Sequence, residues 1–248
     1  MANDNILLFA RKEVKFVLNS REYERIKAAI APYVLKDEFG EYTICNVYFD
    51  NDDDTLIRTS LDKPRFKQKL RLRSYGIPSD SDKVFLEIKK KYAGVVYKRR
   101  IKIAYSQAKE YVYGGKIPEG FQENASFKEI DYFMKEYKLY PKVYLAYDRE
   151  AFFCKNDTSL RITFDKNVRS RYENPSLSCG DYGQILIPRR KNGSDSEPPI
   201  IMELKVSNAL PVWLADVLCE QKIFKSSFSK YGNVYINRFA DKRNELSA

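Results

Sequence analysis

The sequence predicts an α+β fold in which about eight antiparallel strands close into a barrel and helices pack on its outside. Many segments alternate apolar and charged residues with a period of two, which is typical of strands with one buried face. A few segments carry apolar residues at helical spacing and need an apolar surface to cover. The charged register of the strands must then face inward, into a barrel that about eight strands can enclose.

The first half of the chain is predicted to hold strands and one helix. Asn19 or Ser20 is a typical N-cap for that helix, and Ala93-Gly94 suits the turn of a hairpin. The remaining segments alternate with a period of two. In chain order we expect a strand over 11–18, a helix over 20–33, a strand over 41–50 with a short continuation over 55–62, a strand over 66–75, and a hairpin of 83–94 with 95–104.

The second half is predicted to begin with helices and to return to strands. Apolar residues between Phe127 and Tyr137 recur at helical spacing, and Pro211 suits the first turn of a later helix. In chain order we expect helices over 106–114 and 123–139, strands over 142–154 and 160–172, a polar loop over 189–199, a strand over 200–207, a helix over 209–220, and a closing segment over 225–239.

The composition is strongly basic. The 248 residues include 44 Lys and Arg, 34 Asp and Glu and no His, for a net charge of +10. This charge indicates a polyanionic partner, although a generally basic soluble surface would have the same composition. The missing His removes the usual general base and zinc ligand. Four scattered cysteines, the lack of a signal peptide and the lack of a long apolar run lead us to expect a cytoplasmic protein with no membrane span.

One stretch, FKQKLRLRSY at 66–75, places four cations on one strand face with no anion between them. Neighbouring like charges repel, so solvated strand faces usually mix signs. For a single strand a solvated face is still the simpler interpretation, but charged registers recur in several strands. Together they favour an inner wall that binds a polyanion through Arg and Lys. The acids on the same register are candidates for a divalent cation: Glu13, Glu87, Glu203 and Asp165.

Short motifs are spread along nearly the whole chain. They are R-x-E-x-K from residue 11, YFD at 48–50, KLRLRSY at 69–75, E-x-K-K-K at 87–91, KRR at 98–100, YDREAF at 147–152, R-x-T-x-D at 161–165, MELK at 202–205 and FSKY at 228–231. In order and spacing they resemble the VTC domain, the polyphosphate polymerase branch of the triphosphate tunnel metalloenzyme (CYTH-like) superfamily. The resemblance implies a single domain over 1–248 that forms a closed tunnel with basic walls. It also implies ATP-dependent elongation of inorganic polyphosphate, assisted by Mn²⁺ or Mg²⁺.

The resemblance also assigns residues to the site. The catalytic, phosphate-binding cations would be Lys69, Arg71, Arg73, Lys89, Lys98, Arg100, Arg149, Arg161, Lys205 and Lys230. Substrate-binding residues would be Arg11, Lys15 and Lys91, with Tyr48 and Tyr75 as candidates to stack on adenine, against the alternative that these tyrosines only pack. Glu203 would be the carboxylate that binds the metal.

Two departures from the family pattern bear on the activity. Arg11 stands where hydrolase members carry the first acid of E-x-E-x-K, which favours the polymerase branch. Ser227 stands where the polymerase motif KFSKY begins with Lys, and Lys225 lies nearby. We expect a stand-alone catalytic domain that binds ATP and polyphosphate, with protein partners left open. A tunnel triphosphatase and a non-catalytic polyphosphate or inositol-phosphate binding module are the alternatives. The charge also leaves nucleic-acid binding as a fourth possibility. It is not expected, because the cations lie on strand registers shared across the chain and no DNA- or RNA-binding motif is recognised.

Overall fold

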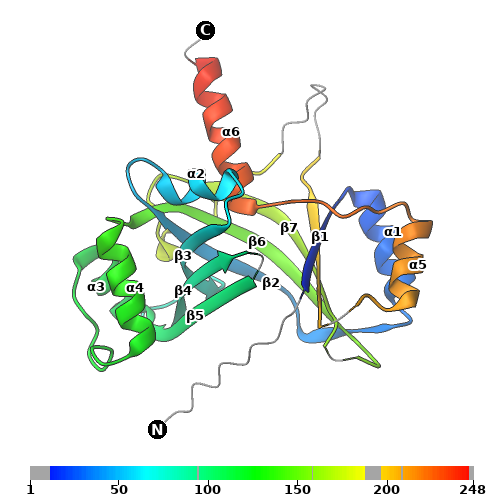
Figure 1. Ribbon diagram of the computed structural model, residues 1–248, viewed down its shortest axis with the longest axis horizontal. Coiled ribbons are helices and arrows are strands. Elements are labelled where there is room, and N and C mark those ends of the chain that lie inside the picture. Colours follow the sequence, from blue (N-terminus) through cyan, green and yellow to red (C-terminus); the bar gives the residue numbers. More distant parts are fainter. Residues whose placement is uncertain (1–11, 94, 158, 188–196, 208, 246–248) are drawn as a thin grey trace. The chain divides into compact units, whose positions relative to one another are not determined.

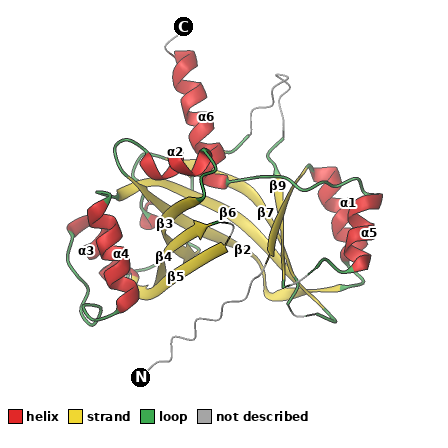
Figure 2. Ribbon diagram, in the orientation of Figure 1, coloured by secondary structure: helices red, strands yellow, loops and turns green. Residues whose placement is uncertain are grey.

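A computed structural model describes residues 12–93, 95–157, 159–187, 197–207 and 209–245. Figure 1 shows the fold coloured along the chain, and Figure 2 shows it coloured by secondary structure. The chain divides into two compact units, each built from three stretches of sequence. Unit 1 consists of Met1–Glu41, Arg149–Lys166 and Pro199–Phe228, and unit 2 consists of Tyr42–Asp148, Asn167–Pro198 and Ser229–Ala248. The single domain over 1–248 stays a prediction.

The strands form one large antiparallel sheet, so the predicted α+β class is confirmed. Its strand order is β1 (Lys12–Leu18), β9 (Ile200–Val206), β7 (Arg161–Arg171), β6 (Tyr140–Cys154), β2 (Val34–Asp50), β3 (Phe66–Tyr75), β4 (Lys83–Tyr92) and β5 (Val95–Ala104), and the short β8 (Gln184–Ile185) pairs with β7. Strands β2, β6 and β7 each contribute to both units.

The prediction that the sheet closes into a barrel is wrong. The strand order has two ends, β1 and β5, which are not paired with each other within the described residues. Alternation along a strand predicts which face is buried, but it does not say whether the end strands meet. The end strand β5 carries Lys98, Arg100 and Lys102 on one face, and charged side chains on an edge strand disfavour further strand pairing.

In unit 1, two neighbouring helices cover the apolar face of the strands (Figure 1). Helix α1 (Ser20–Ile30) begins at a capping box: the Asn19 side chain accepts from the Glu22 amide, and the Glu22 carboxylate accepts from the Asn19 amide, each at 2.8 Å. The predicted N-cap is therefore confirmed. The core joins α1, α5 (Val212–Glu220) and the strands through Tyr23, Ile26, Ile30, Leu214, Leu218, Phe16, Phe164, Met202 and Leu204.

In unit 2, β3, β4 and β5 pair in succession, which confirms the predicted hairpin over 83–104. Helices α3 (Tyr105–Gly114) and α4 (Ala125–Glu136) pack on their apolar face (Figure 1). Arg99 interrupts the alternation of β5 because it points to this side. Its Nε and the Nζ of Lys90 lie 3.1 and 2.7 Å from the carboxylate of Glu129 on α4. The core is built from Leu70, Leu72, Val84, Leu86, Ile88, Ile101, Ile103, Phe127, Ile130 and Phe133.

The segment predicted as a continuing strand over 55–62 is instead helix α2 (Thr55–Leu61). The buried carboxylate of Asp50, the last residue of β2, accepts hydrogen bonds from the amides of Leu56 and Ile57 at 2.8 and 2.9 Å. An acceptor supplied from outside the segment thus satisfies the amides of the first helical turn. The closing segment forms helix α6 (Lys230–Glu245), and a 3₁₀ turn covers Leu177–Cys179. Within the described residues, no helix has both the length and the hydropathy that crossing a membrane would require.

Candidate functional site

The charged side chains lie on the strand face opposite the helices in each unit. In β3, Leu70 and Leu72 belong to the core that the helices cover, so Lys69, Arg71 and Arg73 project from the other face. In unit 1 the same alternation gives β9 a core face and a charged face. Each unit therefore carries a basic strand face of its own.

Unit 2 gathers three cations around one buried carboxylate, Glu87 of β4. Glu87 lies directly opposite Arg71 of β3 and Arg100 of β5 in the strand register. Its carboxylate is 2.7 Å from Nη2 of Arg71, 2.8 Å from Nζ of Lys98 and 3.8 Å from Nη1 of Arg100. We call these four residues the Glu87 cluster. The cluster contains one carboxylate and three cationic side chains, so its net charge is +2 when all four are ionised.

The charges within the Glu87 cluster control its ionisation. Burial raises the pKa of Glu87, but Arg71, Arg73 and Lys98 outweigh burial and lower the pKa to about 2. Burial lowers the pKa of Lys98 to about 8, although the neighbouring Glu87 carboxylate opposes this shift. Glu87 is therefore fully ionised at neutral pH, whereas Lys98 begins to lose its proton at mildly alkaline pH.

Neutral polar groups hold Arg73 beside the Glu87 cluster. The Arg73 Nε donates to Oδ1 of Asn46 at 2.9 Å, and Nη2 donates to the hydroxyl of Tyr147 at 3.0 Å. The Nζ of Lys230, at the start of α6, lies 4.4 Å from the centre of the Tyr147 ring. These contacts fix the direction of the guanidinium without neutralising it.

The FSKY motif packs on the same face. The Nζ of Lys69 donates to Oγ of Ser229 at 3.1 Å. The ring of Tyr231 stacks on Tyr48 with centres 4.9 Å apart, and its hydroxyl donates to Asp50 at 3.2 Å. The motif thereby anchors the start of α6 against strands β2 and β3.

Tyr48 packs rather than presenting an open ring. It is buried, and its hydroxyl accepts from Nη1 of Arg71 at 3.3 Å. Burial alone would raise the pKa of Tyr48, but the charges of Arg71, Arg73 and Lys69 together lower it to about 8. Stacking on adenine stays a prediction for this residue, whose ring already stacks on Tyr231.

In unit 1, Glu203 is the centre of a second group of charges. The register of β1 with β9 places Lys15 opposite Glu203 and Glu13 opposite Lys205. The Glu203 carboxylate lies 3.6 Å from Nζ of Lys15 and 3.1 Å from Nζ of Lys205, and Lys15 also lies 3.1 Å from Glu13. Burial and the charge of Glu13 raise the pKa of Glu203, but Lys205, Lys15 and Arg149 lower it below its usual value. Glu203 is therefore ionised at neutral pH.

Two further arginines of unit 1 are backed by buried acids. Arg149 and Asp165 form a two-point contact, with Nε to Oδ1 at 2.6 Å and Nη2 to Oδ2 at 2.9 Å. Nη2 of Arg161 lies 3.6 Å from Oδ2 of Asp37, a side chain that is 5% exposed. Asp165, one of the predicted metal-ligand candidates, therefore holds an arginine in this structure.

The donors around Glu203 decide what kind of metal site unit 1 could form. Among the described residues, no group of three or more His, Cys, Asp or Glu side chains could hold a metal ion. Thr163 lies opposite Glu203 in the register, and its buried Oγ1 has no hydrogen-bond partner among them. Mg²⁺ and Mn²⁺ are bound through one or two carboxylates, with the remaining ligands from phosphate and water. Glu203, which also pairs with Lys15 and Lys205, could therefore supply one carboxylate ligand to a divalent cation whose remaining ligands come from phosphate and water.

The structure brings together many of the predicted site residues, in two groups. Unit 2 holds Lys69, Arg71, Arg73, Lys89, Lys98, Arg100, Lys230 and Tyr48, and unit 1 holds Lys15, Arg149, Arg161, Lys205 and Glu203. Lys91 is exposed near the β4–β5 turn, and Tyr75 is exposed with its ring edge against Phe85. Arg11 lies outside the described residues.

Three residues that hold the arginines were not predicted: Asn46, Tyr147 and Asp37. Asn46 lies two residues before Tyr48 on β2, and Tyr147 lies two residues before Arg149 on β6, so each shares a strand face with a predicted site residue. This period of two is the sequence signal that could have identified them. Asp37 lies in a part of β2 that was not predicted as a strand.

The VTC domain family model matches residues 10–237, which is most of the chain. This chain belongs to the VTC domain family. The resemblance drawn from the motifs is confirmed.

Two curated proteins similar to this VTC domain are both named vacuolar transporter chaperone complex subunit 4. The protein from Trypanosoma brucei brucei is 27% identical and the one from Trypanosoma cruzi is 24% identical. Each alignment covers 91% of this chain and 34% of the relative, so the chain spans about a third of the length of these relatives. A solved structure described as a putative adenylate cyclase from Bacillus halodurans superposes with a TM-score of 0.54 and 14% identity. The superposition covers 88% of this chain and 95% of the chain in that solved structure, which shows a shared fold.

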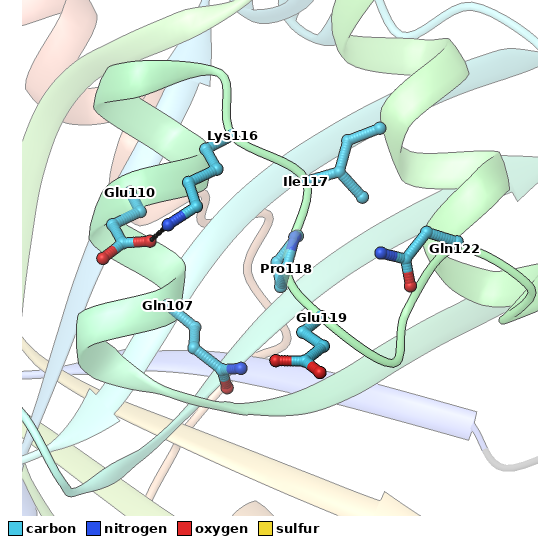
Figure 3. A pocket seen from close by; sticks show the side chains of 7 residues that line it. All are labelled: Gln107, Glu110, Lys116, Ile117, Pro118, Glu119 and Gln122. Atoms are coloured by element: carbon cyan, nitrogen blue, oxygen red, sulfur yellow. Dashed lines mark ion pairs between the residues drawn. The ribbon is translucent and has the colours of Figure 1, made fainter.

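The VTC domain also has a pocket of about 210 Å³ between α3 and the connection to α4 (Figure 3). The carboxylate of Glu110 pairs with Lys116 at its edge, at 2.8 Å. No predicted site residue lines it: the lining residues are Gln107, Glu110, Lys116, Ile117, Pro118, Glu119 and Gln122. With two acids and one base, this pocket does not match a polyanion.

Proposed function

We propose that this VTC domain transfers the γ-phosphate of ATP to the end of an inorganic polyphosphate chain. The observation that supports this best is the Glu87 cluster, in which three cations surround one buried carboxylate. Lys69 and Arg73 extend the same strand face with further positive charge. Polyphosphate is negative at every phosphate, so repeated cations on rigid strands suit it along its length.

The transfer needs no nucleophile from the protein. An oxygen of the terminal phosphate of the chain attacks the γ-phosphorus of ATP, and a new P–O bond forms. The bond from that phosphorus to the β,γ-bridging oxygen breaks, and ADP leaves with the bond's electron pair. Catalysis of phosphoryl transfer rests mainly on positioning and on stabilising charge. A site without histidine is therefore adequate for this reaction.

The contacts of the arginines support this role. Glu87 and Tyr48 hold the guanidinium of Arg71, while Asn46 and Tyr147 hold that of Arg73. A guanidinium that is already oriented loses little conformational entropy when it binds phosphate oxygens. More of its electrostatic attraction is therefore available to stabilise the transition state.

We propose that the basic strand face of unit 1 also binds phosphate, through Arg149, Arg161, Lys15 and Lys205. Mn²⁺ or Mg²⁺ held by Glu203, with the Thr163 hydroxyl beside it, would neutralise charge on phosphate oxygens.

The test is an incubation of the purified protein with ATP, Mn²⁺ and a short polyphosphate primer. The proposal expects ADP release and longer polyphosphate, with a faster start when primer is present. Rapid release of phosphate from tripolyphosphate without polymer would instead identify a triphosphatase. Binding of polyphosphate without any ADP release would identify a binding module. Either of these two results overturns the proposal.

A further inference from the structure

Exposed apolar side chains gather where β3 begins and where β4 turns into β5. Phe66 pairs with Tyr92, and Tyr92 pairs with Val95, across the three strands. Val96 and Tyr97 follow directly on β5. Between 44% and 51% of each of these five residues is exposed. We call them the hairpin tip: Phe66, Tyr92, Val95, Val96 and Tyr97.

The grouping of these side chains is unusual for a surface. Single exposed apolar residues are normal, but contiguous ones on paired strands mark a surface that something covers. The backbone of the hairpin tip is tied together, because the amide of Ala93 donates to the carbonyl of Arg65 at 2.8 Å. The side chains also project from both faces of the strands: Val96 alternates with Val95 and Tyr97.

Cations surround the hairpin tip. The segments 63–69 and 89–100 contain ten Lys and Arg residues and no Asp or Glu. Burial, followed by the charges of Lys91, Lys63 and Lys89, lowers the pKa of Lys67, as expected where like charges crowd. The guanidinium of Arg65 lies 5.9 Å from the centre of the Tyr92 ring. An exposed aromatic ring and a cation are therefore adjacent.

We propose that the hairpin tip docks on the surface of an anionic lipid bilayer. Tyrosine side chains are favoured at the level of the lipid headgroups, and aliphatic side chains are favoured deeper, at the boundary with the acyl chains. Lys and Arg are favoured next to anionic headgroups. A soluble polyanion would account for the cations but would gain nothing from Val95 and Val96. The side chains project from both faces of the hairpin end. Lipids can surround both faces at once, whereas the surface of a folded protein partner would cover one face more readily than both.

This inference does not depend on the proposed function. None of the five hairpin-tip residues is among those proposed to bind phosphate or the metal. A docked hairpin tip would hold the domain against a membrane surface whether or not it makes polyphosphate.

The test is co-sedimentation of the protein with vesicles of phosphatidylcholine containing about 30% phosphatidylserine. The variant Tyr92→Thr/Val95→Thr/Tyr97→Thr keeps every charge and places threonine, a β-branched residue suited to strands, at all three positions. The matched control, Tyr132→Gln/Val212→Gln/Phe224→Gln, removes one Tyr, one Val and one Phe that are 67%, 76% and 78% exposed elsewhere. We expect the hairpin-tip variant to lose affinity about tenfold or more and the control to lose less than about twofold. Circular dichroism checks that both variants fold.

A second measurement reports insertion directly. Tyr97→Trp adds an indole at the hairpin tip, and brominated phosphatidylcholine mixed into the vesicles quenches indoles that reach the acyl boundary. We expect quenching in excess of that of the wild type, whose only tryptophan is Trp213. Equal vesicle binding by the hairpin-tip variant and the wild type would overturn the proposal. So would a lack of any vesicle binding, which would leave an acidic protein as the better partner.

Discussion

Replacing Glu87 with glutamine would leave Arg71, Lys98 and Arg100 facing a neutral amide. Burial raises the pKa of Glu87, but Arg71, Arg73 and Lys98 bring it down from 4.5 to about 2. One pKa unit corresponds to about 1.4 kcal/mol. The ionised carboxylate therefore adds on the order of 3 kcal/mol to the free energy of unfolding at pH 7, and Glu87→Gln should lose it.

The sign of the pH dependence follows from the lowered pKa. The contribution of Glu87 is complete above its unfolded pKa near 4.5 and is lost as the pH falls toward 2. Urea unfolding should therefore show the full gap between wild type and Glu87→Gln at pH 7 and a smaller gap at pH 3. For a chain of this size the midpoint of thermal unfolding should fall by about 6–12 °C.

Tripolyphosphate should partly replace the missing charge. Because the variant has one more uncompensated cation, tripolyphosphate should raise its unfolding midpoint more than that of the wild type. Glu129→Gln is the matched control, since Glu129 pairs with Lys90 and Arg99 on the helix side and is partly exposed. It should cost less than about 1 kcal/mol and leave the effect of tripolyphosphate unchanged. A Glu87→Gln protein as stable as the wild type at pH 7 would refute the reasoning.

Three further predictions follow from the structure. The affinity for tripolyphosphate, measured by calorimetry, should fall between pH 7 and 9. Over this range Lys98 loses its positive charge and Tyr48 gains a negative charge, because each has a pKa of about 8. A Tyr48→Phe/Lys98→Arg protein with the same pH profile as the wild type would contradict this. Arg161→Ala should lower the free energy of unfolding by about 1–3 kcal/mol, because the buried side chain of Asp37 would lose its ion-pair partner, and adding Asp37→Asn should recover most of it. Additive effects in this double-mutant cycle would rule out the pairing. Asn19→Ala should cost about 1 kcal/mol in urea unfolding, because it removes the helix cap, while the affinity for tripolyphosphate stays the same. An Asn19→Ala protein of unchanged stability would show that the cap is dispensable.

The strands could be predicted from the sequence where a segment alternates cleanly, as in 66–75 and 83–104. Helix α2 could not, because its first-turn amides are satisfied by Asp50 of the preceding strand, which is a contact made only in the folded chain. Closure of the sheet was predicted wrongly, since alternation carries no information about whether β1 and β5 pair.

The charged face of the site followed from the same alternation, but its internal pairing did not. Glu87 holds Arg71 and Arg100 because strand register places it between them, and register depends on how the hairpin folds. Asp37 was missed for a different reason. The segment 34–41 lacks a clean period of two, and Gly40 interrupts it with a φ of 67°.

The ratio of ADP released to phosphate gained by the polymer tests the central claim most directly. Wild-type protein with ATP, Mn²⁺ and primer should release one ADP for each phosphate added to polyphosphate. Arg71→Ala should stay folded, because Lys98 and Arg100 still pair with Glu87, yet it should lose most of this transfer. Free phosphate in place of polymer from the wild type, or full transfer by Arg71→Ala, would contradict the account.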